Sequence, residues 1–120
     1  MKWLLIFIGG GLGSALRYSL FTLNKKVNFF QLPVGTIIAN ILACITMALL
    51  LFLISKKYIN PSIWSYLGLI GFCGGFSTFS TFSMESAMLI KSGMWWAAAL
   101  NIVVSMLSCI TLLYFFTKNA

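Results

Sequence analysis

The chain is too apolar and too weakly charged for an ordinary water-soluble domain. Of its 120 residues, 61% are hydrophobic and only 8% are charged, whereas about a quarter of a typical soluble domain is charged. It contains one acidic residue, Glu85, and no histidine, and its mean hydropathy is +1.03. So little charge cannot cover a surface that faces water. We therefore expect an integral membrane protein with one domain, residues 1–120.

Four apolar runs are long enough to cross a bilayer, which takes about 20 residues for about 30 Å of hydrocarbon. They cover residues of about 3–23, 32–55, 63–90 and 94–117, joined by short polar segments. The first run resembles a secretory signal peptide, but it is longer than a signal core and has no Ala-x-Ala cleavage site. The sequence therefore predicts an all-α membrane protein with four transmembrane helices.

The net charge of +7 comes from basic residues near the ends of the runs, so it does not indicate a nucleic-acid partner. With a cytoplasmic N-terminus, four lysines lie inside and three outside: Lys2, Lys56, Lys57 and Lys118 against Lys25, Lys26 and Lys91. The positive-inside rule needs a larger asymmetry to fix one orientation. Two alternatives remain: insertion in both orientations, which would make an antiparallel homodimer natural, or one orientation set weakly by residues 56–57.

The three cysteines, Cys44, Cys73 and Cys109, stand singly in three different runs. Their spacing fits neither a zinc site nor a disulfide framework. We expect them to be buried free thiols.

The third run holds the most polar residues, which are costly inside a membrane. Residues 71–85 have the sequence GFCGGFSTFSTFSME. The Gly-Gly pair at 74–75 followed by Ser-Thr at 77–78 predicts a helix break near mid-membrane. The backbone groups that the break frees would need protein, water or ion partners. The alternative is an unbroken helix whose glycines allow close packing.

Four phenylalanines of this run follow one side of a helix: Phe72, Phe76, Phe79 and Phe82. Packing or lipid contact is the simplest role for such a stripe. The functional alternative uses the positive edge of the phenyl ring, against which a small dehydrated anion can sit beside hydroxyl donors.

Two other runs carry polar residues on one face. Asn40 follows Thr36 by one helical turn, and Asn101, Ser105 and Ser108 form a stripe in the fourth run. Each set either lines a wet path or hydrogen-bonds neighbouring helices.

The first run carries Gly9 and Gly13, a G-x-x-x-G pair that favours close helix contact. Arg17 follows within the same run. It either extends to the interface or attracts an anion into a vestibule.

Three motifs together resemble the CrcB/Fluc family of fluoride channels. They are GGxxGSxxRY at 9–18, GTxxxN at 35–40 and GGFSTFSTFSME at 74–85. The motifs occur in the family's order, and the resemblance covers nearly the whole chain. It implies a multi-pass protein of the bacterial plasma membrane that exports cytoplasmic fluoride passively. It also implies an antiparallel, dual-topology homodimer with two fluoride pathways.

The resemblance also implies roles for individual residues. Phe79 and Phe82 would be the pore phenylalanines and Asn40 the pore asparagine, with Thr81 as the hydroxyl residue between the two rings. Arg17 would be the vestibule arginine. Glu85 closes the third motif without an assigned role.

Two further roles come from the same resemblance. Gly74 and Ser77 would offer backbone carbonyls to a structural sodium ion at the dimer centre. On the fourth run, Ser105 would line the pore and Cys109 would follow a turn later, whereas a shifted register would use Ser108.

Two other functions are alternatives for a chain with four spans. A small multidrug-type, proton-coupled exporter needs a membrane-embedded acid early in the chain, but no acid precedes Glu85. A helper subunit without transport activity would not need the polar stripes. The sequence has no P-loop, no histidine and one carboxylate, so we expect no enzyme.

Overall fold

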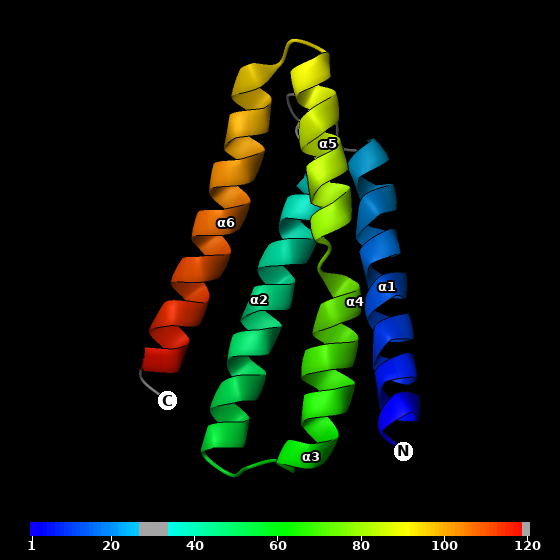
Figure 1. Cartoon of the computed structure of the whole chain (residues 1–120), viewed down its shortest axis with the longest axis vertical. Helices are drawn as coiled ribbons and strands as arrows, with labels where there is room; N and C mark the ends of the chain where they lie inside the picture. The colour runs from blue at the N-terminus through cyan, green and yellow to red at the C-terminus, as the bar shows by residue number, and fades with distance from the viewer. Residues whose placement is uncertain (27–33, 119–120) are drawn as a thin grey trace.

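The computed structural model describes residues 1–26 and 34–118, and all the regular elements in these ranges are helical (Figure 1). Helices α1 (Lys2–Lys26), α2 (Val34–Ser55) and α6 (Trp95–Lys118) each form one span. The third span contains α3 (Pro61–Trp64), the π-helix η1 (Ser65–Cys73), α4 (Gly74–Phe76) and α5 (Phe79–Lys91). All four segments are long and apolar enough to cross a membrane, which confirms the predicted all-helical architecture. The predicted start of the second run, at residues 32–33, lies outside the described residues.

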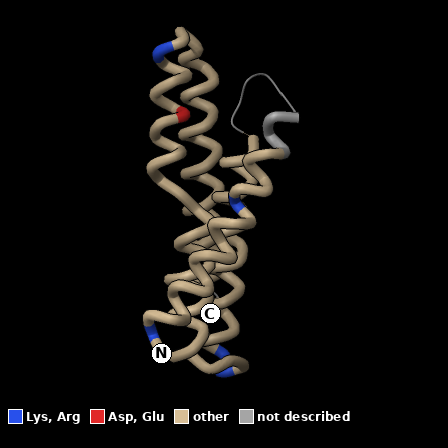
Figure 2. Tube along the Cα trace, turned by 90° about the vertical axis from the view of Figure 1, so that its right-hand side faces the viewer, with Lys and Arg blue, Asp and Glu red and all other residues tan. Residues whose placement is uncertain are grey.

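The molecule is elongated, as a membrane-spanning bundle requires. Its dimensions are 48 × 31 × 20 Å, and the long axis compares with a bilayer thickness of about 40–45 Å including headgroups. Figure 2 shows most of the basic residues at the two ends of this long axis. Lysines at those ends can reach the headgroup region, where a charged side chain is not penalised.

Helix α1 lies directly against the backbone of the third span. A Cβ atom placed on Gly9 would lie 2.1 Å from the carbonyl oxygen of Leu67, and one on Gly13 would lie 2.2 Å from that of Phe72. A Cβ on Gly75 would lie 2.4 Å from the carbonyl oxygen of Gly10. Only glycine permits this approach, so the G-x-x-x-G pair makes the close contact that the sequence predicts.

The third span changes its helical geometry twice. Asn60 caps its start, since its Oδ1 atom accepts hydrogen bonds from the amides of Ser62 at 2.9 Å and Ile63 at 3.4 Å. The nine residues of η1 then form a π-helix, which the sequence analysis did not predict. Long π-helical stretches are rare, and this one carries two buried glycines, Gly68 and Gly71, beside α2 and α1 respectively.

The helix is interrupted between α4 and α5. Ser77 (φ −85°, ψ 151°) and Thr78 (φ −148°, ψ 124°) have extended backbone conformations, and Figure 1 shows the resulting gap in the ribbon. The interruption divides the phenylalanine stripe. Because the helix ends at Phe76, the expectation that all four rings follow one helix side is wrong.

The two halves of the stripe have different surroundings. Phe76 is 1% exposed and packs against Ala39 and Ala43 of α2, with Phe72 beside it at a ring-centroid distance of 5.5 Å. Phe79 and Phe82 come after the interruption and lie elsewhere. Phe76 therefore belongs to the hydrophobic core, and the partly buried Phe72 packs against it.

We expect Gly13→Ala to destabilise the protein by about 1–3 kcal/mol, the usual cost of forcing extra atoms into a packed contact. The added methyl group would meet the carbonyl oxygen of Phe72 and push α1 away from η1. Thermal unfolding in detergent measures the effect. Gly11→Ala is the matched control, because nothing lies within 4 Å of its added Cβ. Equal melting temperatures for the two variants would contradict the close packing of α1.

Candidate functional site

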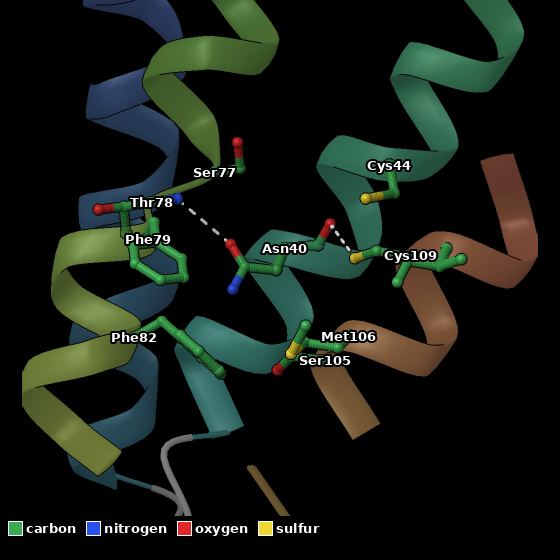
Figure 3. Close-up of a pocket in the computed structure, with 10 residues that line it drawn as sticks. Asn40, Cys44, Ser77, Thr78, Phe79, Phe82, Ser105, Met106 and Cys109 are labelled. Carbon is green, nitrogen blue, oxygen red and sulfur yellow. Dashed lines mark hydrogen bonds between the residues drawn. The ribbon is translucent and has the colours of Figure 1, made fainter. Parts of the chain in front are cut away.

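A cavity of about 300 Å³ lies beside the interruption of the third span (Figure 3). Four of the predicted pore residues line it: Asn40, Phe79, Phe82 and Ser105. The remaining lining residues come from α2, the interruption and α6: Cys44, Ser77, Thr78, Met106, Cys109 and Ile110. None of the ten side chains carries a formal charge when the cysteines are protonated. The structure thus brings most of the predicted site together in a neutral cavity.

Asn40 connects α2 to the interruption. Its Oδ1 atom accepts a hydrogen bond from the backbone amide of Thr78 at 3.3 Å. In Figure 3 its Nδ2 atom points away from Thr78, toward the side of the cavity that holds Phe82. The side chain is 9% exposed, and its Nδ2 atom makes no hydrogen bond with any residue in the described ranges. This amide is therefore a donor available to a ligand in the cavity.

The two phenylalanines of the cavity are close to each other but differ in burial. Their ring centroids are 5.9 Å apart and the ring planes meet at 38°. Phe82 is 8% exposed, whereas Phe79 is 79% exposed. The single chain thus buries one ring of the pair and leaves the other uncovered.

Helix α5 begins at the edge of this cavity. Thr78 caps it, since its Oγ1 atom accepts a hydrogen bond from the amide of Thr81 at 3.4 Å. The positive end of the helix dipole points toward the interruption. This orientation favours negative charge near Phe79.

The interruption releases the backbone carbonyls of Gly74 and Ser77. In a continuous α-helix they would accept from the amides of Thr78 and Thr81, respectively. Those amides donate instead to Asn40 and to the Thr78 hydroxyl. Among the described residues, no cluster of histidine, cysteine or acidic side chains has metal-ligand spacing. Carbonyl oxygens are the ligand type that hard cations prefer, so the donor set fits the expected sodium ion.

A second cavity of about 260 Å³ contains the other two predicted residues, Arg17 and Thr81. It is formed by α1, α2 and α5, and is also lined by Tyr18, Phe21, Gly35, Thr36 and Met84. The six predicted pore residues therefore occupy two cavities and not one. Thr81 and Phe82 are consecutive on α5, so this helix forms part of both walls.

Glu85 is anchored next to the second cavity. Its Oε1 atom accepts a hydrogen bond from the Thr36 hydroxyl at 2.8 Å. Its Oε2 atom is buried and has no hydrogen-bond partner in the described part of the chain. The sequence pattern places Thr36 on one helix face with Asn40 but does not indicate its contact with Glu85. A contact between residues 49 positions apart has no local signal.

The polar residues of the fourth span have different surroundings: one lines a cavity and another hydrogen-bonds a neighbouring helix. Ser105 is 4% exposed, lines the first cavity and has an Oγ atom with no hydrogen-bond partner in the described ranges. Asn101 is fully buried and donates from Nδ2 to the Ser86 hydroxyl at 2.9 Å, which joins α6 to α5. Cys109 lines the cavity and Ser108 does not. Ser105 and Cys109 therefore lie on the side of α6 that faces this cavity, and Ser108 does not.

The three cysteines are free thiols, but only Cys73 is fully buried. Cys44 and Cys109 are partly exposed and line the first cavity. The expectation of three buried thiols is therefore wrong for these two. Cys109 donates from Sγ to the backbone carbonyl oxygen of Asn40 at 3.5 Å.

Comparison with known proteins gives consistent matches along the chain. The family model described as "CrcB-like protein, Camphor Resistance (CrcB)" matches residues 4–116. The chain is similar to the "Fluoride-specific ion channel FluC" of Coxiella burnetii (strain Dugway 5J108-111), with 41% identity over 92% of this chain and 90% of the relative. It is 49% identical to the protein of that name from Phocaeicola vulgatus, over 77% of this chain and 75% of the relative. A third, from Shewanella frigidimarina, is 35% identical over 92% and 89%.

Proposed function

The chain belongs to the CrcB family, and on that premise we propose that it is a fluoride-specific ion channel of the bacterial plasma membrane. The structural observation that carries the proposal is the neutral cavity, where the Asn40 amide faces two phenyl rings. The protein is a channel and not an enzyme. The proton-coupled exporter has no support, since the relatives are named as fluoride channels.

The cavity provides weak contacts suited to a small anion. The Asn40 Nδ2 and Ser105 Oγ groups can each donate a hydrogen bond to fluoride. The rings of Phe79 and Phe82 offer the positive edges of their quadrupoles. None of the ten described residues that line this cavity is a cation that would hold the ion strongly. Conduction requires such a balance, because an ion that binds tightly does not leave.

The cavity that contains Arg17 is the proposed entrance for the anion. Arg17 gives it a positive charge, and Thr81 offers a hydroxyl group next to Phe82 in the sequence. An anion drawn toward Arg17 would pass along α5 from the second cavity to the first. The Thr36 hydroxyl is hydrogen-bonded to Glu85, and this contact holds the chain's only acidic side chain at the α2 side of α5.

The driving force for this transport is the membrane potential. HF is uncharged and crosses membranes, and in a cytoplasm more alkaline than the medium it ionises, so that fluoride accumulates inside. An inside-negative potential drives a monovalent anion outward with about 2.3 kcal/mol per 100 mV. A passive pore is therefore sufficient for export, and no ATP-binding or catalytic residue is needed.

A second copy of the chain is the proposed partner, packed in antiparallel orientation. Phe79 has a ring that is 79% exposed, although it belongs to the site. A Cβ on Gly74 would meet nothing within 4 Å, so the side of the third span that Gly74 presents is uncovered within the described chain. The lysine balance of four to three permits both orientations in one membrane. Two opposed copies would cover both features and form two pathways.

A structural sodium ion at the centre of this dimer is proposed on the same grounds. The carbonyls of Gly74 and Ser77 lack their helical donors, and in hydrocarbon such groups need another partner. Two copies would bring four carbonyl oxygens to one ion. The proposed break near mid-membrane would place this ion at the bilayer centre.

We expect Phe79→Ile and Phe82→Ile each to slow fluoride efflux from liposomes by up to about tenfold. Isoleucine keeps the side chain apolar but removes the ring quadrupole. A ring-edge contact of up to about 1.5 kcal/mol corresponds to about a factor of ten in rate. A fluoride electrode outside liposomes that contain purified protein measures the rate.

Phe72→Ile is the control for the pore variants, since Phe72 lies outside both cavities. Phe76 is unsuitable because it is 1% exposed in the core, and its replacement would destabilise the protein. Parent-like efflux through both Phe79→Ile and Phe82→Ile would exclude the ring-edge mechanism.

We expect a reporter fused to the C-terminus to be found on both sides of the membrane. The four-to-three lysine count provides too little asymmetry to select one side. Neutralising Lys56 and Lys57 together should shift the population toward an N-terminus outside. Labelling of intact and permeabilised cells with a membrane-impermeant reagent measures the two fractions. A reporter found on one side alone would show that dual topology is wrong.

We expect the parent protein to melt at a lower temperature when sodium is replaced by N-methyl-D-glucamine, and Gly74→Ala to abolish this difference. The added methyl group meets nothing within 4 Å in the single chain, so its effect would come from the ion or the partner. Ser77→Ala keeps the carbonyl group and should keep the sodium response. Gly75→Ala is a contrasting variant, because its Cβ would lie 2.4 Å from the Gly10 carbonyl oxygen and should lower the melting temperature in both buffers. A parent protein insensitive to sodium would rule out the structural ion.

A further inference from the structure

Two cysteines that are distant in the sequence face the same cavity. Cys44 on α2 and Cys109 on α6 both line the space beside the interruption. Figure 3 shows both sulfur atoms beside Asn40. Both residues are free and partly exposed, so neither thiol is sealed in the core. The fold thus brings two cysteines from separate spans to one cavity.

The other groups around this pair define its ligand chemistry. The cavity contains the thioether of Met106 but no carboxylate and no imidazole. Thiolate and thioether sulfur atoms favour soft cations, whereas carboxylate, carbonyl and water oxygens favour hard ones. Two thiols alone also fall short of the four ligands of a structural zinc site. The lining therefore suits a soft cation that accepts two sulfur ligands.

We propose that Cys44 and Cys109 together bind one soft, thiophilic cation of the Cu⁺, Ag⁺ or Hg²⁺ class. On binding, each thiol loses its proton to water and its sulfur atom forms one bond to the metal. For Hg²⁺ the two thiolates balance the charge of the cation, so the neutral cavity stays neutral overall. The site is distinct from the proposed sodium site, which uses backbone carbonyls of the third span.

An ion bound at this pair stops fluoride passage, a step that rests on the proposed function. The Cys109 thiol donates to the Asn40 backbone carbonyl, and the Asn40 side chain holds the Thr78 amide. Binding removes the Cys109 proton and therefore the first of these hydrogen bonds. The metal also occupies space in a cavity of about 300 Å³ that the anion must cross.

Retention of Hg²⁺ against a monothiol competitor tests the site directly. Purified protein is loaded with Hg²⁺, exchanged into buffer with excess glutathione, and assayed by intact mass and by ultraviolet absorption of the mercury–thiolate bond. We expect the parent protein to keep one Hg²⁺ per chain with loss of two protons. Cys44→Ser and Cys109→Ser should each retain the ion at least tenfold more weakly, because a single thiolate exchanges with glutathione. Cys73→Ser is the matched control and should retain Hg²⁺ like the parent, since Cys73 does not line the cavity.

Retention that is equal in Cys44→Ser, Cys109→Ser and the parent would overturn the paired site. The melting temperature shows whether each variant is folded. If one of the two serine variants folds poorly, the other still provides the comparison with the parent. Fluoride efflux is then measured with and without Hg²⁺. Block of the parent and of Cys73→Ser but not of Cys44→Ser or Cys109→Ser supports the inference. A parent protein that retains Hg²⁺ and still conducts overturns the block. A parent protein that never conducts refutes the proposed function, while the retention assay still decides the metal site.

Discussion

The hydrogen bond from the Thr78 amide to the Asn40 side chain is the contact on which the rest of the site depends. Water is absent from the hydrocarbon core, so an amide that leaves its helical acceptor must find another within the protein. Leaving it unpaired costs on the order of 2–7 kcal/mol. Because α2 offers an acceptor at this depth, Ser77 and Thr78 can adopt extended conformations. Because the Thr78 amide donates to Asn40, the Gly74 carbonyl loses its helical donor. The same interruption of the helix separates Phe76 in the core from Phe79 and Phe82 in the cavity.

The interruption also divides the polar groups by charge. Arg17 lies in one cavity, and the other has only uncharged donors and ring edges. In the proposed channel, attraction of the anion and its passage would occur in different cavities, so the Arg17 charge would not hold the ion in the cavity that it must cross. Close packing of α1 against η1 and α4 fixes the position of Arg17 relative to α5. Glycines on both sides of this contact make the helices approach more closely than any larger residue allows.

The sequence predicted those features that depend on composition or on matched motifs. Run lengths predicted four spans because hydropathy is a property of each segment alone, and the three motifs predicted Asn40 and Phe82 as cavity residues. The motifs could not predict that Thr81 would face a different cavity from its neighbour, since helix rotation is decided by packing. The same applies to Ser105 rather than Ser108 in the fourth span. Cys44 and Cys109 line one cavity from different spans, and Thr36 of α2 donates a hydrogen bond to Glu85 of α5. Neither span alone carries a signature of these relations.

The contact between α1 and the third span also limits when α1 can pack during synthesis of the chain. Ser14 on α1 donates from its hydroxyl to the carbonyl oxygen of Gly75, 61 residues later in the chain. At about 5–20 residues per second, a ribosome takes roughly 3–12 s to make that stretch. During this interval α1 is already long enough to enter the bilayer, but its glycine face has no partner and contacts lipid. Helix α1 therefore waits for its partner until residue 75 reaches the membrane, and α5 and α6 can pack only after that.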